Sequence, residues 1–185
     1  CMSPSIQLLK DRYLKNIKEN PELYIGIELE FPIVHTKGQP TDIEVSKELM
    51  RFLVDALSLV VEKEDQDGNP IQLVEPVSQD RILFEVSYTT LEFAFGRAQN
   101  IQEVEGRFET YMKVIQEKLG EKAHAIQGWG IHPHWDQNDN RPVAYPRYQM
   151  LMDYLHMGSH QERADLHDFP EYGAFICGSQ VQLDI

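Results

Sequence analysis

The sequence predicts an α+β fold in which short antiparallel strands form a sheet and helices pack against it. Two observations indicate this class. Four segments repeat apolar residues with the period of a helix, and six short segments read as strands, bounded by turn-forming residues. Neither an internal repeat nor a linker divides the chain, so we expect a single domain over residues 1–185.

The helical segments are recognised by their apolar stripes and by the residues at their ends. Asn100 is a favoured N-cap, Gly120 a favoured stop, and Pro146 a favoured first-turn residue. Helices are expected at residues 3–19, 43–62, 100–119 and 146–157. Strands are expected at residues 24–34, 71–75, 81–86, 90–95, 124–132 and 178–185. Turns or surface loops are expected at residues 65–70, 137–142 and 158–173, the last a candidate lid.

Composition and charge exclude several classes of protein. The net charge is −13, which argues against nucleic acid or an anionic membrane as a partner, because both need a basic surface. The chain has no run of 18 apolar residues, and its first residues, CMSPSIQLLKDRYLKN, lack the apolar core of a signal peptide. We therefore expect a soluble, cytoplasmic protein. The acidity reflects either solubility alone or a site that concentrates divalent cations, and the total charge does not decide between them.

Three predicted strands have one apolar face and one face of carboxylates or amides. In YIGIELEFPIV, residues 24–34, Glu28 and Glu30 share a face because successive side chains of a strand point to opposite sides. Their backbones would lie about 7 Å apart, where two like charges repel by about 2 kcal/mol. The polar faces of TTLEFAFG and GSQVQLDI include Glu92, Gln180, Gln182 and Asp184.

None of these three polar faces carries Lys or Arg. A polar face turned to water is the ordinary explanation for one such strand. Three faces without a basic residue favour a bound cation, because water-facing strand positions accept Lys and Arg as readily as Glu and Gln. Mg²⁺ is the natural candidate, since it takes oxygen ligands and shares its coordination shell with substrate phosphates. We therefore expect Glu28 and Glu30 to be tolerated together because they bind metal.

A rival metal site and a candidate nucleophile also occur in the sequence. The stretch HPHWD places His132, His134 and Asp136 at alternate positions, as in a metal triplet. Pro133 interrupts a regular strand there, so we expect the histidines to have a structural role. Cys177 lacks the setting of a nucleophile and is expected to be a small buried residue.

In their order along the chain, several motifs resemble the glutamate–cysteine ligase superfamily. They are GIELE, LEFA, GWGIHP, RPVAYPRYQMLMDYL and SQVQLD, and together they span residues 24–185. The resemblance implies a curved antiparallel sheet similar to that of glutamine synthetase. It also implies an enzyme of glutathione-type thiol synthesis, which uses ATP and Mg²⁺ to join the γ-carboxylate of glutamate to the amine of cysteine.

The resemblance further implies site residues on three strands. The metal ligands would be Glu28, Glu30 and Glu92, and the nucleotide contacts Gln180 and Gln182. Arg147 and Tyr148 match a family motif to which we assign no role. Known members are longer and use basic residues of a second half for ATP and glutamate. We therefore expect this chain to be the N-terminal portion of a larger catalytic domain, inactive alone and prone to self-association through an unpaired sheet edge.

Three alternatives stay open on the sequence. One is a related ligase with another amine acceptor, and the second is a non-catalytic domain that keeps the metal- or nucleotide-binding face. The third is a glycosidase, which also uses paired carboxylates. A glycosidase needs them on opposite sides of a sugar, about 5 to 10 Å apart, and two glutamates on one strand face do not offer this.

Overall fold

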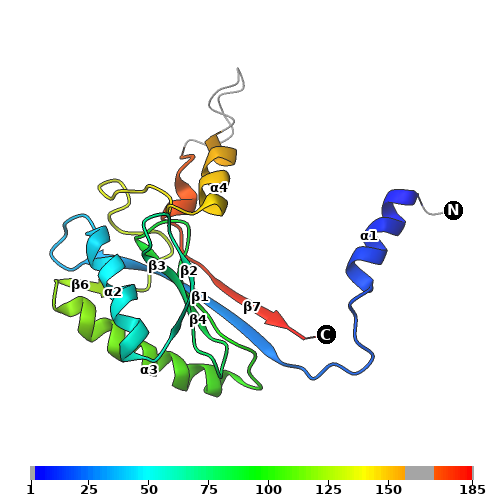
Figure 1. The fold of residues 1–185 in the computed structure, drawn as a ribbon. Coiled ribbons are helices and arrows are strands. Elements are labelled where there is room, and N and C mark those ends of the chain that lie inside the picture. The colour runs from blue at the N-terminus through cyan, green and yellow to red at the C-terminus, as the bar shows by residue number, and fades with distance from the viewer. Residues whose placement is uncertain (1–2, 157–168, 185) are drawn as a thin grey trace.

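The computed structural model describes residues 3–156 and 169–184, which contain a seven-stranded antiparallel sheet. The strands are β1 (Ile25–His35), β2 (Val60–Glu64), β3 (Pro70–Val74), β4 (Arg81–Phe84), β5 (Thr90–Ala94), β6 (His124–Ile126) and β7 (Ser179–Leu183). Their order is β2-β3-β4-β5-β1-β6, and β7 also pairs with β1. Figure 1 shows β7 lying alongside β1 although most of the chain separates them. The long strand β1 therefore collects neighbours from distant parts of the sequence.

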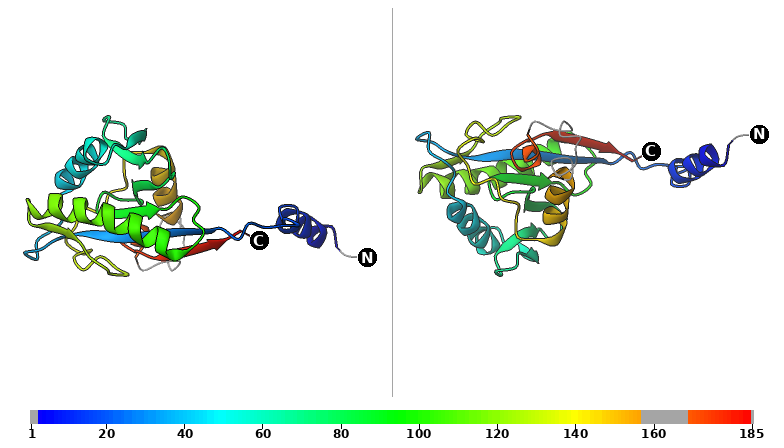
Figure 2. Two further views of the ribbon diagram at one scale, coloured as in Figure 1. Left: turned by 90° about the horizontal axis from the view of Figure 1, so that it is seen from below. Right: turned by 90° about the horizontal axis from the view of Figure 1, so that it is seen from above.

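The helices differ in how closely they join the sheet. They are α1 (Pro4–Leu14), α2 (Ile43–Ala56), α3 (Ile101–Gly120) and α4 (Pro146–His156), with a short 3-10 helix, η2 (Tyr172–Ala174). Helices α2 and α3 bury apolar side chains in the core, whereas no residue of α1 is buried. Figures 1 and 2 show α1 standing apart from the rest of the molecule. The α+β fold class is confirmed.

Helix α3 confirms its prediction, whereas three predicted ranges extend too far, among them 3–19, whose helix α1 ends at Leu14. The Asn100 side chain accepts a hydrogen bond from the Glu103 N–H at 3.0 Å and caps α3. The predicted helix 43–62 ends at Ala56, because Ser58 takes a left-handed backbone (φ 52°) and the chain continues as β2. The predicted strand 124–132 stops at Ile126. Beyond it the chain is irregular apart from an isolated bridge at Ile131, and turns begin at Pro133, which has no N–H to donate to a ladder.

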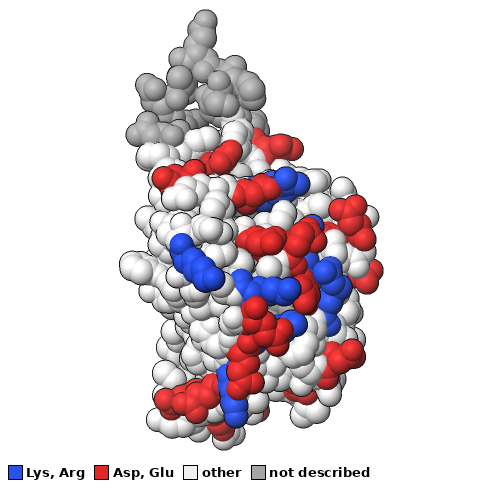
Figure 3. Space-filling view, turned by 90° about the vertical axis from the view of Figure 1, so that its left-hand side faces the viewer, with Lys and Arg blue, Asp and Glu red and all other residues white. Residues whose placement is uncertain are grey.

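Two further predictions concern loops and surface. Most of the predicted loop 158–173 lies outside the described residues, and its last part enters η2. Within residues 3–156 and 169–184, no helix combines the length and apolar character needed to cross a membrane. Figure 3 shows acidic and basic side chains intermingled on one face of the molecule. The acidity of the chain is therefore spread over the surface as well as gathered on the sheet.

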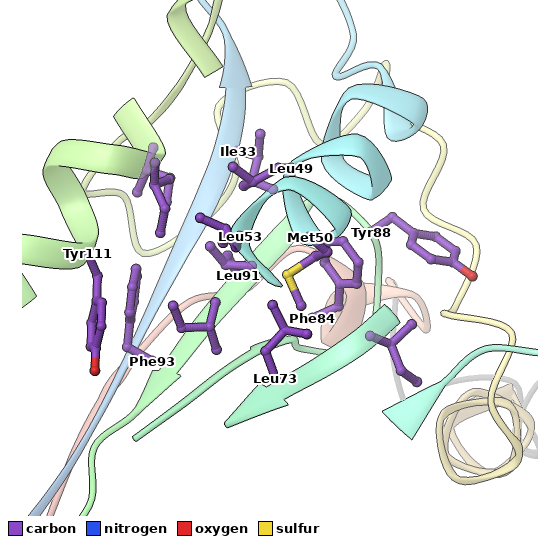
Figure 4. Close-up of a cluster of buried hydrophobic side chains, with 14 of the residues drawn as sticks. Ile33, Leu49, Met50, Leu53, Leu73, Phe84, Tyr88, Leu91, Phe93 and Tyr111 are labelled. Carbon is purple, nitrogen blue, oxygen red and sulfur yellow. The ribbon is translucent and has the colours of Figure 1, made fainter. Parts of the chain in front are cut away.

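The core lies between α2, α3 and the apolar face of the sheet. Leu49, Met50 and Leu53 of α2 are fully buried, and they belong to one cluster with Leu73, Phe84 and Leu91 of the strands (Figure 4). A second group of rings, from β5 and α3, packs edge-to-face and stacked around Phe93. Because strand side chains alternate, this packing fixes which residues of β1 and β5 face the other way.

Candidate functional site

Antiparallel pairing brings the predicted site residues onto one face of the sheet, opposite the core. Glu30 of β1 lies opposite Glu92 of β5, and Glu28 lies opposite Gln180 of β7. Directly opposed residues of antiparallel strands point to the same side, so these four side chains share a face. We call this surface, with Gln182 and Glu85 introduced below, the carboxylate face. The shared face predicted from strand alternation is thus present.

Strand β7 contributes amides that contact the carboxylates. Gln182 lies opposite Gly26, and its amide Nε2 donates to Glu28 Oε1 at 3.3 Å. At the start of β7, the Gly178 N–H donates to Glu30 Oε2 at 2.7 Å. Gln180 is exposed. The strand therefore orients both glutamates of β1 and leaves an amide open to solvent beside them.

Glu85 is a further carboxylate on this face, and sequence reasoning missed it. Leu83 lies opposite Glu92, so Glu85, two residues farther along, points to the same side. Its backbone N–H donates to the Thr90 carbonyl at 3.1 Å, which keeps it in register with β5. Glu85 and Glu30 line a hollow of about 230 Å³ together with Leu151 and Leu155 of α4. The strand alternation over residues 81–86 was the signal that could have identified it.

Two carboxylates of this face, Glu92 and Glu30, have raised pKa values, chiefly because they are buried. Glu92 is only 9% exposed, and burial raises its pKa to about 8, with further upward contributions from a hydrogen bond to Glu85 and from the charges of Glu85, Glu28 and Glu30. Burial also raises the pKa of Glu30, against the opposing effect of the Gly178 N–H. Near neutral pH, protonation therefore removes part of the negative charge of this face.

The types of side chain on this face suit a hard divalent cation, although they do not form a complete metal site by themselves. Within the described residues, no group of three or more His, Cys, Asp or Glu side chains is arranged so that it could hold a metal ion. Mg²⁺ does not require such a group, because it is usually held by one or two carboxylates together with water and substrate phosphates. Carboxylate and amide oxygens are among its ligands, and a cation would offset both the burial of these carboxylates and their mutual repulsion. The residues present therefore fit Mg²⁺ shared with a substrate.

His132 of the rival metal triplet has a structural environment. It is fully buried, and its Nε2 lies 2.9 Å from the Ile33 carbonyl oxygen and 3.1 Å from Thr41 Oγ1. Its Nδ1 accepts a hydrogen bond from the His134 backbone N–H at 3.1 Å. These contacts tie the loop after β6 to the far end of β1. Burial lowers the pKa of His132 accordingly.

Of three other residues singled out in the sequence, Tyr148 and Cys177 lie near carboxylates of this face, and their roles are structural. Tyr148 is buried, and its hydroxyl donates to the Phe84 carbonyl at 3.0 Å, which anchors α4 to β4. Arg147, its neighbour, is exposed. Burial raises the pKa of the Cys177 thiol to about 12. At neutral pH this thiol stays protonated, so it is not an activated nucleophile.

The sequence of this chain matches a known protein family. The model of glutamate–cysteine ligase family 2 (GCS2) matches residues 24–185, which is most of the chain. The chain belongs to this family. The resemblance drawn from the motifs is therefore confirmed. A search of curated proteins gave no match.

Membership of the GCS2 family suggests a carboxylate–amine ligase of the glutamate–cysteine ligase kind. The match begins immediately before β1 and includes every strand of the described sheet, while α1 lies outside it. The carboxylate face therefore belongs entirely to the part of the chain that resembles GCS2 proteins.

Proposed function

We propose that this protein acts as an ATP- and Mg²⁺-dependent ligase that joins the γ-carboxylate of glutamate to the amine of cysteine. The observation that carries the proposal is the grouping of Glu28, Glu30 and Glu92 on one sheet face of a GCS2 family member. The partners would be glutamate, cysteine and ATP, with no role for nucleic acid or a membrane. A thiol substrate favours the reducing cytoplasm as the location.

The chemistry explains why such a face is useful. A carboxylate does not react with an amine at neutral pH until one of its oxygens becomes part of a leaving group. An oxygen of the γ-carboxylate attacks the terminal phosphorus of ATP, and ADP leaves. The amine then attacks the acyl carbon and loses a proton, phosphate leaves, and an amide bond remains. Catalysis of the first step consists mainly of positioning the reactants and neutralising their charge.

The described residues would supply the positioning. One or two carboxylates of Glu28, Glu30 and Glu92 would hold each Mg²⁺ together with water and phosphate oxygens, and Gln180 and Gln182 would contact the nucleotide from β7. Bound Mg²⁺ would neutralise phosphate charge. Because Glu28 and Glu30 are fixed by Gln182 and Gly178, their carboxylates are held in place before a substrate arrives.

Glu28→Gln in the full-length protein tests the proposal. The substitution keeps the volume of the side chain and removes one charge from the face. We expect kcat/KM for ADP release, in the presence of ATP, Mg²⁺, glutamate and cysteine, to fall by about a hundredfold or more. The matched control is Glu117→Gln, an exposed glutamate of α3 on the core side of the sheet, which should leave the rate unchanged.

Two measurements separate this proposal from its rivals. Thermal unfolding of Glu28→Gln should match the parent, because the removed charge sits among like charges. Normal kinetics with a large loss of thermal stability would refute the role of Glu28. Binding of Mg²⁺ and nucleotide without ADP release would identify a non-catalytic domain. ADP release with another amine but not with cysteine would identify a related ligase.

A further inference from the structure

A second hollow, of about 560 Å³, adjoins the carboxylate face at Glu28. Its lining also includes Arg81 of β4 and Arg97, which follows β5. Ala94 lies opposite both Arg81 and Glu28, so these three residues form one row across β4, β5 and β1. The hollow therefore opens on the same side of the sheet as the carboxylates. Its volume lies within the usual range for small-molecule sites.

Small residues create the space between its charged walls. Ala94 and Gly96 of the lining carry little or no side chain, and Gly26 lies in the next row of β1. A larger side chain at Ala94 would project between Arg81 and Glu28. At these small residues a ligand can approach the backbone closely.

The two arginines that line the hollow make different contacts. Arg81 is engaged by Glu62, which accepts from its Nε and its terminal nitrogen at 2.8 Å each. The guanidinium of Arg97 lies 5.1 Å from the ring centroid of Tyr24, over the face of the ring. Its charge also acts on Asp184, whose pKa it helps to lower. Stacking occupies the flat face of a guanidinium and leaves its N–H edge free to donate.

An exposed arginine is ordinarily just solvated, but the position of Arg97 favours a ligand. The chain has 30 acidic residues against 17 basic ones, and the guanidinium of Arg97 lies in the hollow that Glu28 also lines. An anionic substrate that approaches Glu28, Glu30 and Glu92 needs a cation close by. A planar guanidinium presents paired donors that match phosphate or carboxylate oxygens.

We infer that the hollow at Arg97 is the subsite for the phosphate chain of the nucleotide, with Arg97 as its direct contact. This inference rests on the proposed function and adds to it a binding residue of the chain itself. Phosphate fits better than the carboxylate of an amino acid, because an amino acid would also bring an ammonium group toward Arg97. A polyphosphate carries only negative charge, and it is long enough to extend from the metal-binding carboxylates into the hollow.

Equilibrium binding tests the inference in the full-length protein. The probe is the Mg²⁺ complex of the β,γ-imido analogue of ATP, measured by calorimetry against the parent, Arg97→Gln and Arg97→Lys. We expect Arg97→Gln to weaken binding by about tenfold or more, and Arg97→Lys to restore part of the loss. Arg12→Gln on α1, remote from the sheet, is the matched control and should bind like the parent.

The outcomes separate the subsite from the ligase reaction. Unchanged analogue binding by Arg97→Gln would overturn the inference, as would weaker binding of glutamate with unchanged binding of the analogue. An active ligase with an Arg97-independent KM for ATP would overturn the subsite and leave the proposed function standing. Arg97-dependent binding of the analogue without ADP release would support the subsite and refute the ligase. A parent protein that binds no analogue would overturn both.

Discussion

Glu92 has a strongly shifted pKa on the carboxylate face. It lies opposite Glu30, is nearly buried, and has Glu85 within hydrogen-bonding distance. Burial and like charge both favour its protonated form, so its pKa rises to about 8. Without a metal ion, the folded state therefore favours a protonated Glu92 at neutral pH.

This shift predicts how stability depends on pH when metal is removed. A carboxyl whose pKa is higher in the folded state stabilises the fold at low pH. That stabilisation is lost as the pH rises from about 4.5 toward 8. Glu92→Gln is neutral at every pH. In EDTA at pH 8 we expect it to be more stable than the parent by up to about 4 kcal/mol, and at pH 5 by less than about 1 kcal/mol.

Urea unfolding of the parent and Glu92→Gln at several pH values would measure the difference. Glu117→Gln removes an exposed carboxylate of α3 and should run parallel to the parent. A Glu92→Gln curve that is also parallel to the parent would contradict the raised pKa.

At the scale of elements, the loop between β3 and β4 is fastened to the end of β5 at a glycine. The Gly96 N–H donates to Asp80 Oδ1 at 2.7 Å, and the buried Asp80 also accepts from the Tyr111 hydroxyl of α3 at 2.7 Å. A Cβ at position 96 would lie 1.8 Å from the Ser78 carbonyl oxygen, far inside contact distance. This close approach connects two strands, a loop and a helix, and it also shapes one wall of the Arg97 hollow.

Gly96→Ala should therefore destabilise the protein by about 3 kcal/mol or more, because backbone must move to accommodate the methyl group. Gly106→Ala is the matched control in α3, where a Cβ would meet nothing within 4 Å. Alanine in a helix interior should stabilise by up to about 1 kcal/mol. Chemical denaturation would compare the two variants, and equal effects would show that the approach of Ser78 to Gly96 is not tight.

The elements also show what could be predicted from the sequence and what could not. Alternation placed Glu28, Glu30 and Glu92 on polar strand faces, and Asn100 marked the start of α3, because both signals are local. The left-handed backbone at Ser58, which ends α2 early, has no marker in the residue type. The Arg97 hollow depends on the register of β4, β5 and β1, and sequence alone does not specify which residues face each other across strands.

At the scale of the whole molecule, β7 extends the apolar face of the sheet beyond β1, to an edge that is exposed to solvent. Val181 lies opposite Ile27, and both Val181 and Leu183 are 66% exposed. They adjoin a groove of about 380 Å³ that Ile27 and Leu29 line with Ile101 and Phe108 of α3. Among the described strands, β7 pairs with β1 alone, so its other side presents unpaired backbone groups.

An apolar edge strand of this kind favours association between copies of the 185-residue chain. A second copy could pair with the free side of β7 and cover Val181 and Leu183 at the same time. We expect the chain to shift from monomer to dimer or larger species as its concentration rises. Val181→Lys should suppress the shift, because a charged side chain on an edge strand opposes pairing.

Sedimentation velocity over a range of concentrations would measure this. The matched control is Val60→Lys, since Val60 is 52% exposed on β2, the strand at the opposite edge of the sheet. If both variants associate like the parent, the exposed apolar residues of α1, such as Leu8 and Tyr13, become the stronger candidates for the contact. A chain that stays monomeric at every concentration would show that the twist of β7 and the acidic surface suffice to protect the edge. Suppression by Val181→Lys alone would place the contact on β7, the strand that also carries Gln180 and Gln182.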